Sequence, residues 1–177
     1  MLSLRSLPRT ALLAAALLVT GCDSNSVSSG GNDTCVSGSL TATADGAAFA
    51  AECVTFSLDS GVLSLGALVN ADGGDGATQR QITLSVPGAA EGTASAPAGF
   101  VGTYTDGALS GSQFSGTSTT GLSGTLTLET LTDSRAVGTF SFSGSEFELS
   151  ATAGGAGSGT PTGRTVAVTD GTFDIRL

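Results

Sequence analysis

From Ser39 to the last residue, apolar side chains recur at every second position rather than at every third or fourth. The segments Leu63–Val69 and Ile82–Val86 show this alternation clearly. A period of two is that of a β-strand, whose successive side chains point to opposite faces of a sheet. No window of a dozen residues after the N-terminal segment keeps helical spacing. Residues 39–177 are therefore predicted to form one all-β domain.

Short polar clusters rich in Gly, Ser, Asp and Asn separate about ten short strands in this pattern. Turns are predicted at Asp45-Gly46, Asp59-Ser60-Gly61 and Asp170-Gly171. The Gly-rich segments Ala71–Gly76 and Ala153–Gly163 are predicted to be loops. Many short strands joined by such turns are typical of an antiparallel β-sandwich or β-barrel, and the sequence leaves both open.

The apolar residues near the end of the chain fall on the face that is predicted to be buried. Phe140, Phe142, Phe173 and Ile175 are expected to face the core, and Leu177 continues the last alternation. The C-terminal segment is therefore expected to be part of the fold, so that its truncation would unfold the domain.

The composition excludes several classes of function. The chain has six basic residues, all Arg, against 15 acidic ones, and contains no His or Trp. Without His, no Ser-His-Asp triad, Cys-His pair or imidazole metal site can form. A formal charge of −9 argues against nucleic acid, whose phosphates require a basic surface.

The N-terminal residues read as an export signal. Arg5 and Arg9 lie in a short basic region, and Ala11–Val19 follows without a polar side chain. This apolar run is much shorter than the roughly 20 residues that span a membrane. A basic region, a short apolar region and small residues before a cleavage point are typical of a secretory signal.

The cleavage point itself carries a motif. Val19-Thr20-Gly21-Cys22 resembles the bacterial lipobox, in which cleavage before the Cys exposes a thiol that receives a diacylglycerol. The resemblance implies lipidation of Cys22, which anchors the mature protein to a membrane. Residues 1–21 would be the lipoprotein signal peptide. The outer membrane is favoured over the inner one as the location, and both stay open.

Residues 22–38 are predicted to be the lipidated Cys and a tether rich in Ser, Gly and Asn. Sixteen such residues reach roughly 22 Å on average. Removal of the signal peptide takes away two Arg and no acid, so the charge falls from −9 to −11. A surface of this charge stays soluble and is repelled by anionic headgroups.

Cys35 and Cys53 are the cysteines that remain, in a compartment where disulfides persist. A bridge between them would close a loop of about 19 residues and contribute roughly 3 kcal/mol of stability. Two separate thiols are the alternative, and geometry decides between these readings.

Three further groups could carry chemistry. Asp72 and Asp75 lie in a Gly-rich segment that could offer oxygen ligands to Ca²⁺, although a solvated turn is the simpler reading. Glu146 and Glu148 lie two residues apart, as a glycosidase pair could, but a solvent-facing edge strand explains them better. Tyr104 and Phe100 could form an aromatic platform for a sugar or could belong to the core. No cofactor and no catalytic residue is assigned.

Three segments of the domain carry a resemblance when taken together: Val137–Phe142, Val168–Ile175 and Thr43–Ala50. They resemble a family of small uncharacterised envelope lipoproteins. The resemblance implies a secreted, lipid-anchored β domain with no assigned activity and no ligand residues to transfer.

These observations give three functional hypotheses. The first is a non-catalytic, lipid-anchored envelope protein that acts as a structural or protein-interaction module. The second is a lipoprotein that binds a glycan or another small ligand. The third, which the absence of His and Lys disfavours, is a carboxylate-dependent hydrolase.

Overall fold

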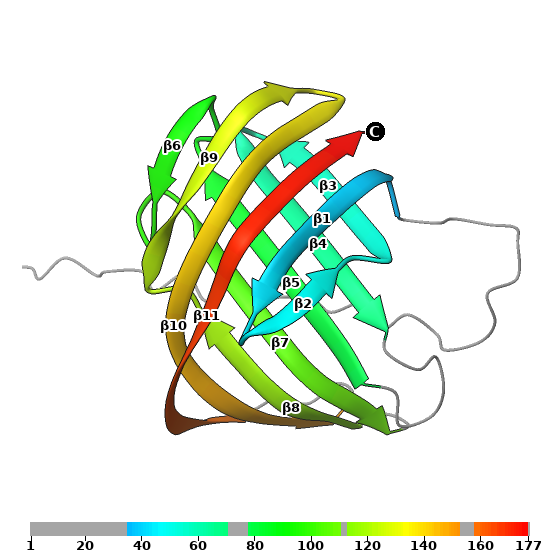
Figure 1. The fold of residues 1–177 in the computed structure, drawn as a ribbon, viewed down its shortest axis with the longest axis vertical. Coiled ribbons are helices and arrows are strands. Elements are labelled where there is room, and N and C mark those ends of the chain that lie inside the picture. The colour runs from blue at the N-terminus through cyan, green and yellow to red at the C-terminus, as the bar shows by residue number, and fades with distance from the viewer. Residues whose placement is uncertain (1–34, 71–77, 111–112, 153–157, 177) are drawn as a thin grey trace, which may run out of the picture. The chain divides into compact units, whose positions relative to one another are not determined.

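The computed structural model describes residues 35–70, 78–110, 113–152 and 158–176 (Figure 1). These ranges contain eleven strands and no helix, and every strand pairing is antiparallel. Nothing helical in these ranges could therefore cross a membrane. The predicted all-β antiparallel fold is confirmed.

The strands follow one another closely along the chain. They are β1 (Ser37–Ala44), β2 (Ala47–Ala50), β3 (Cys53–Asp59), β4 (Val62–Asn70), β5 (Thr78–Pro87), β6 (Gly92–Ser95), β7 (Val101–Ser110), β8 (Gln113–Thr120), β9 (Ser123–Thr132), β10 (Arg135–Thr152) and β11 (Ser158–Arg176). Nine of them form a continuous sheet in the order β2-β1-β11-β10-β8-β7-β5-β4-β3, and β9 and β6 extend from β10. The sequence left a sandwich and a barrel open. The sheet is neither a sandwich nor a closed barrel, because it curls into a half-barrel.

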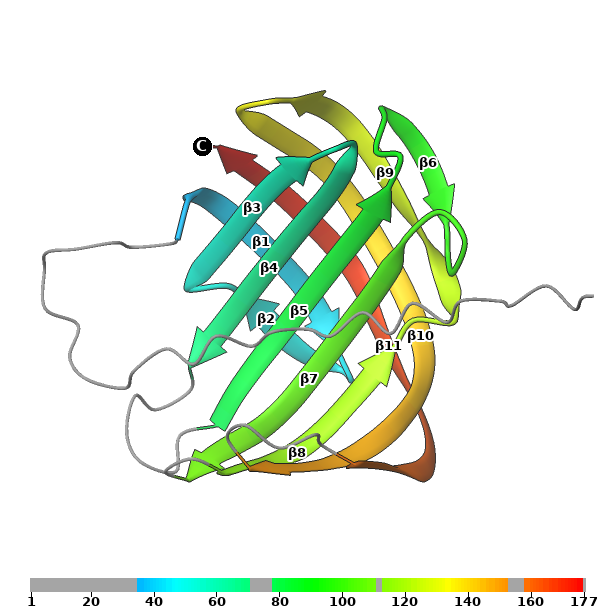
Figure 2. The ribbon, with the colours of Figure 1, turned by 180° about the vertical axis from the view of Figure 1, so that it is seen from behind.

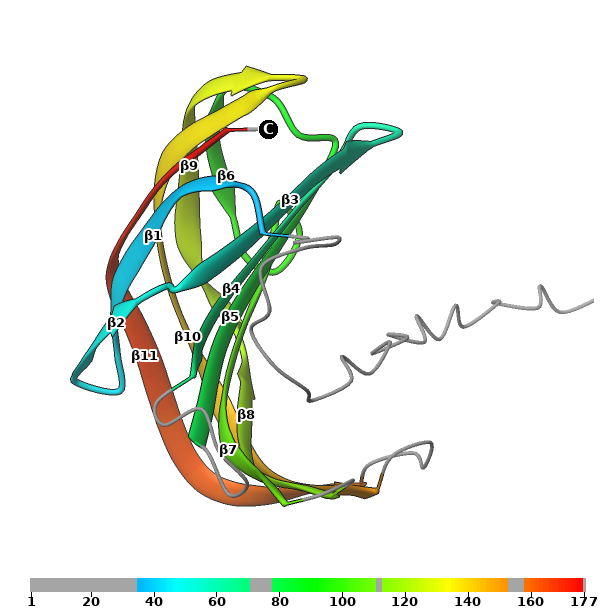
Figure 3. The same ribbon diagram turned by 90° about the vertical axis from the view of Figure 1, so that its right-hand side faces the viewer.

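Two long strands make the sheet curl. Figure 3 shows β10 and β11 bending from the wall that holds β1 to the wall that holds β7 and β8. The first half of β10 pairs with β9 and its second half with β8. Leu122, in the link between β8 and β9, donates its backbone N–H to the Ser143 carbonyl at 2.9 Å. Consequently β8 and β9 act as one bent partner along the length of β10.

Glycines allow close packing where β10 passes from β9 to β8. The Phe142 ring is buried against Gly102 and Gly121. A Cβ added to Gly102 would lie 2.5 Å from Phe142 Cδ1, and one on Gly121 would lie 3.0 Å from Phe142 Cβ. Side chains at these two positions would therefore displace the ring from the core.

Two of the three predicted turns are hairpin turns. Asp45 and Gly46 have φ of 48° and 77°, and Ser60 and Gly61 have φ of 51° and 77°. Positive φ at both central residues is the mark of the type I′ hairpin turn, whose twist matches that of the flanking strands.

The third predicted turn, at Asp170-Gly171, is wrong. β11 runs through these residues as a bulge, with Asp170 at φ 52° and the register shifting against both β1 and β10. Strands on both sides hold β11 extended, so the extra residue is absorbed locally. Gly171 is required by close packing, because a Cβ there would lie 2.6 Å from the Phe140 ring.

The core lies on the concave face of the half-barrel. Phe140, Phe142, Phe173 and Ile175 are all buried, as predicted. Leu177, Ala71–Gly76 and residues 153–157 lie outside the described residues. The predicted loop Ala153–Gly163 is wrong from Ser158 onward, because those residues form the start of β11.

Candidate functional site

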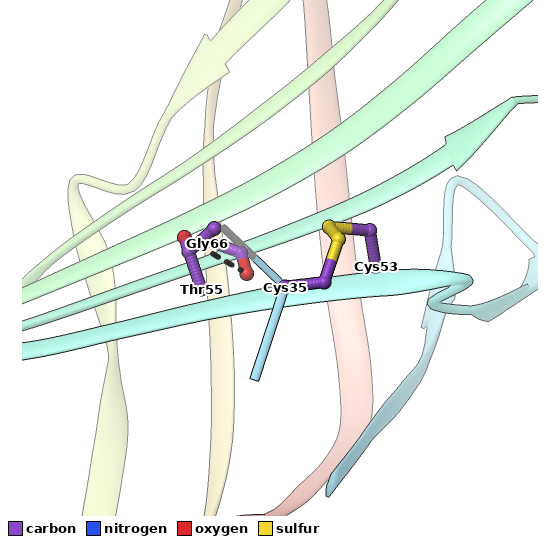
Figure 4. The surroundings of a disulfide bond; sticks show 4 residues. All are labelled: Cys35, Cys53, Thr55 and Gly66. Atoms are coloured by element: carbon purple, nitrogen blue, oxygen red, sulfur yellow. Dashed lines mark hydrogen bonds between the residues drawn. A yellow bond between two sulfur atoms is a disulfide. The ribbon is translucent and has the colours of Figure 1, made fainter. Parts of the chain in front are cut away.

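The Cys35–Cys53 pair ties the start of the domain to β3. The two sulfur atoms lie at disulfide-bonding distance and the Cα atoms are 5.3 Å apart, within the range that disulfides require (Figure 4). The predicted pairing is confirmed by this geometry. Beside it, Val36 donates its backbone N–H to the Val54 carbonyl at 2.8 Å. Together these contacts join the β1 side of the curled sheet to β3, the last strand of the sheet order.

A second contact joins the two walls through a side chain. Arg80 lies on β5, and its Nη1 donates a hydrogen bond to the Ala48 carbonyl of β2 at 3.0 Å. The guanidinium carbon lies 5.7 Å from the centroid of the Phe49 ring, within cation–π range. Arg80 therefore fastens β2 to the wall formed by β3, β4, β5 and β7. Figure 2 shows the strands of this wall toward the viewer.

Two cross-strand rows of the concave face are apolar on β3 and β4 and become polar toward β10. One cross-strand row consists of Val54, Ala67, Ile82, Tyr104, Thr119 and Glu146. The next row consists of Val69, Arg80, Asp106, Thr117 and Glu148. Residues directly opposite one another in a sheet share a face, so these polar groups belong to the same inner surface. We call the polar members of the two rows the polar end.

Glu146 is the most buried charged group of the polar end, with an exposed fraction of 4%. Thr162 Oγ1 donates a hydrogen bond to Glu146 Oε2 at 2.8 Å, and Arg164 Nη1 lies 3.1 Å from Glu146 Oε1. The prediction that Glu146 faces solvent on an edge strand is therefore wrong. β10 is an internal strand here, between β8 and β11, and only Glu148 is exposed.

Arg164 links Glu146 to the first hairpin. Its Nη2 donates a hydrogen bond to Asp45 Oδ2 at 2.9 Å, and Asp45 occupies the turn between β1 and β2. The hydrogen bond to Asp45 and the charge of Glu146 both raise the pKa of Arg164 above its ordinary value. Gly163, with φ of 79°, forms the bulge of β11 that brings Thr162 and Arg164 together over Glu146.

Tyr104 and Phe100 belong to the core rather than to a sugar-binding platform. Phe100 is fully buried and Tyr104 is 5% exposed. The Tyr104 hydroxyl donates a hydrogen bond to Asp106 Oδ2 at 3.1 Å. Burial, reinforced by the negative charge of Asp106 and this hydrogen bond, raises the pKa of Tyr104 to about 12.

Several predicted site residues lie outside the described part of the chain. Cys22 and the calcium candidates Asp72 and Asp75 are among them. Within the described ranges, no group of three or more Cys, Asp or Glu side chains could hold a metal ion.

A hollow of about 330 Å³ lies elsewhere, between the β5–β6 connection and β9. Val86, Leu126 and Leu128 form its apolar wall, and Glu91 stands beside them. The charged groups of the polar end do not line this hollow.

The chain was compared with protein-family models, with curated proteins and with solved structures, and none of them matches. Lipidation of Cys22 and the resemblance to envelope lipoproteins stay predictions from the sequence.

The single tyrosine of the chain provides a direct test of the polar end. Because the pKa of Tyr104 is raised from about 10 to about 12, its neutral form is favoured in the folded protein. This contribution to stability, about 3 kcal/mol, is complete below pH 10 and is lost as the pH rises from about 10 to 12. Phenolate absorbance, followed with circular dichroism, measures it. Titration near pH 10 in a still-folded protein would contradict the assignment, and Asp106→Asn is expected to lower the pKa.

Glu146 and Glu148 form a matched pair for mutation. Glu146→Ala is expected to reduce the free energy of unfolding by about 1–3 kcal/mol, because Thr162 and Arg164 lose the carboxylate that they contact and a buried cavity forms. Glu148→Ala changes an exposed side chain and is expected to shift stability by less than about 0.5 kcal/mol. Urea unfolding of both variants measures the difference. Equal effects would show that Glu146 is not the buried partner of Thr162 and Arg164.

Proposed function

We propose that the protein is an exported, lipid-anchored protein of the bacterial cell envelope, and that its β domain is a non-catalytic interaction scaffold. The observation that carries the proposal is the Cys35–Cys53 pair at disulfide distance. Disulfides persist outside the cytosol, and this agrees with an export signal at residues 1–21. The lipobox Val19–Cys22 then supplies the anchor.

The position of the disulfide suits a tethered domain. Cys35 lies within residues 22–38, predicted as the tether, two residues before β1 begins at Ser37, so a pull from the membrane side reaches β3 through the sulfur–sulfur bond. Without that bond, the pull would be carried by the Val36–Val54 hydrogen bond and by the ladders of β1 to β11 and β2. The covalent link therefore supports a domain that holds its shape while it is attached to a membrane.

The contacts of the polar end support a scaffold more than a hydrolase. Both carboxylate oxygens of Glu146 are engaged, one by Thr162 and the other by Arg164. A general acid must pass its proton to a substrate, whereas this carboxylate is held by residues of β11. The same residues connect β10, β11 and the β1–β2 turn through Asp45. The arrangement fits a structural role for the charges.

Lipid attachment is tested by replacing the acceptor. The full chain, expressed in a Gram-negative host, is expected in the membrane fraction with a diacylglyceryl group on an N-terminal Cys22, as read by mass spectrometry. Cys22→Ala is expected to lack the lipid and to leave that fraction, because the thiol that receives the lipid is gone. A Cys35→Ala/Cys53→Ala variant is the control and is expected to retain the lipid. An unmodified Cys22 in the wild-type protein would refute the anchor.

A further inference from the structure

The backbone edges of the curled sheet are protected to different extents. Arg80 covers β2 through the Ala48 carbonyl. Glu91 Oε1 accepts a hydrogen bond from the Leu131 N–H of β9 at 3.2 Å. β6 is only four residues long. Charged side chains and short strands are the usual means by which natural sheets avoid edge-to-edge pairing.

The edge of β3 lacks this protection beyond its first residues. The Val54 carbonyl accepts a hydrogen bond from Val36, so it points away from β4. Because N–H and C=O directions alternate along an antiparallel strand, the groups of Phe56 and Leu58 also point away from β4. In the described part of the chain, no hydrogen-bond partner is found for them. The segment Val54–Leu58 contains no charge, no Pro and no bulge.

We propose that this edge pairs with β3 of a second copy of the chain. An antiparallel pair centred on Ser57 places Phe56 of one copy opposite Leu58 of the other. The outward N–H and C=O groups of these two residues then form four hydrogen bonds across a twofold axis. The two half-barrels become one continuous sheet, by the strand addition that other proteins use in recognition.

Charge favours this edge as the place where two copies meet. The protein has a formal charge of −9, so two copies repel one another over most of their surfaces. Between Val54 and Leu58 the chain carries no charged residue, and Ser57 lies opposite its own counterpart in the proposed pair. The contact is short, so the dimer is expected to be a small, transient interface. The proposal deepens the scaffold function by naming a partner, and it does not depend on lipid attachment.

The test places a charge at the twofold axis. Ser57→Lys puts two Lys side chains opposite one another in the dimer, whereas Ser57 is exposed in a single copy. Like charges directly opposite are destabilising, so dimerisation is expected to weaken about fivefold. Ser64→Lys is the matched control: Ser64 is exposed and lies beside Ser57, but on the internal strand β4. Sedimentation equilibrium of the full chain carrying Cys22→Ser, with its disulfide intact, measures the association.

Three results support the proposal together: wild-type dimerisation in the micromolar to millimolar range, its weakening by Ser57→Lys but not by Ser64→Lys, and its recovery in a mixture of Ser57→Lys with Ser57→Asp. Slower hydrogen exchange of the Phe56 and Leu58 amides at high concentration is expected as well. A monomer at every concentration, or equal effects of Ser57→Lys and Ser64→Lys, overturns it. Because Cys22 is replaced in all samples, failure of the lipid-anchor proposal would not produce these outcomes.

Discussion

The fold depends on joining the two walls of a curled sheet that does not close through a continuous ladder. β3 ends the sheet order on one side, and β1 and β2 end it on the other. In the part of the chain that the structure describes, they are bridged by the Cys35–Cys53 pair, the Val36–Val54 backbone hydrogen bond and the Arg80–Ala48 hydrogen bond. A closed barrel satisfies its edges along every strand. Here a covalent link and one guanidinium replace most of that ladder, and among the described residues nothing pairs with the later part of β3 on its outer side.

Much of this architecture could be predicted from the alternation of the sequence. Leu63, Ile82 and Phe173 fall on the buried face because side chains alternate strictly along a strand. The failure at Asp170-Gly171 has a physical cause. An Asp-Gly pair can form a hairpin turn, as at Asp45-Gly46, where both residues have positive φ, or lie in a bulge, where only Asp170 does. The sequence does not show which strands lie on either side.

The polar end could be predicted in part. Arg80 lies in phase with Ile82, Leu84 and Val86, and Glu146 lies in phase with Phe140 and Phe142. The alternation alone therefore places both charged residues on the inner face. Their partners could not be predicted in this way. Thr162 and Arg164 reach Glu146 because of a bulge at Gly163, and Asp45 joins them from 119 residues away. Such contacts depend on a register that three-dimensional packing sets.

Equilibrium urea unfolding of Cys35→Ser, Cys53→Ser and the double variant tests the account most directly. If the disulfide joins the two walls, each variant loses about 3 kcal/mol of unfolding free energy, and the double variant loses no more than either single one. The Val36 amide is then expected to lose its protection from hydrogen exchange in all three. Variants as stable as the wild-type protein, or single losses that add in the double variant, would show that the curled sheet does not depend on this bond.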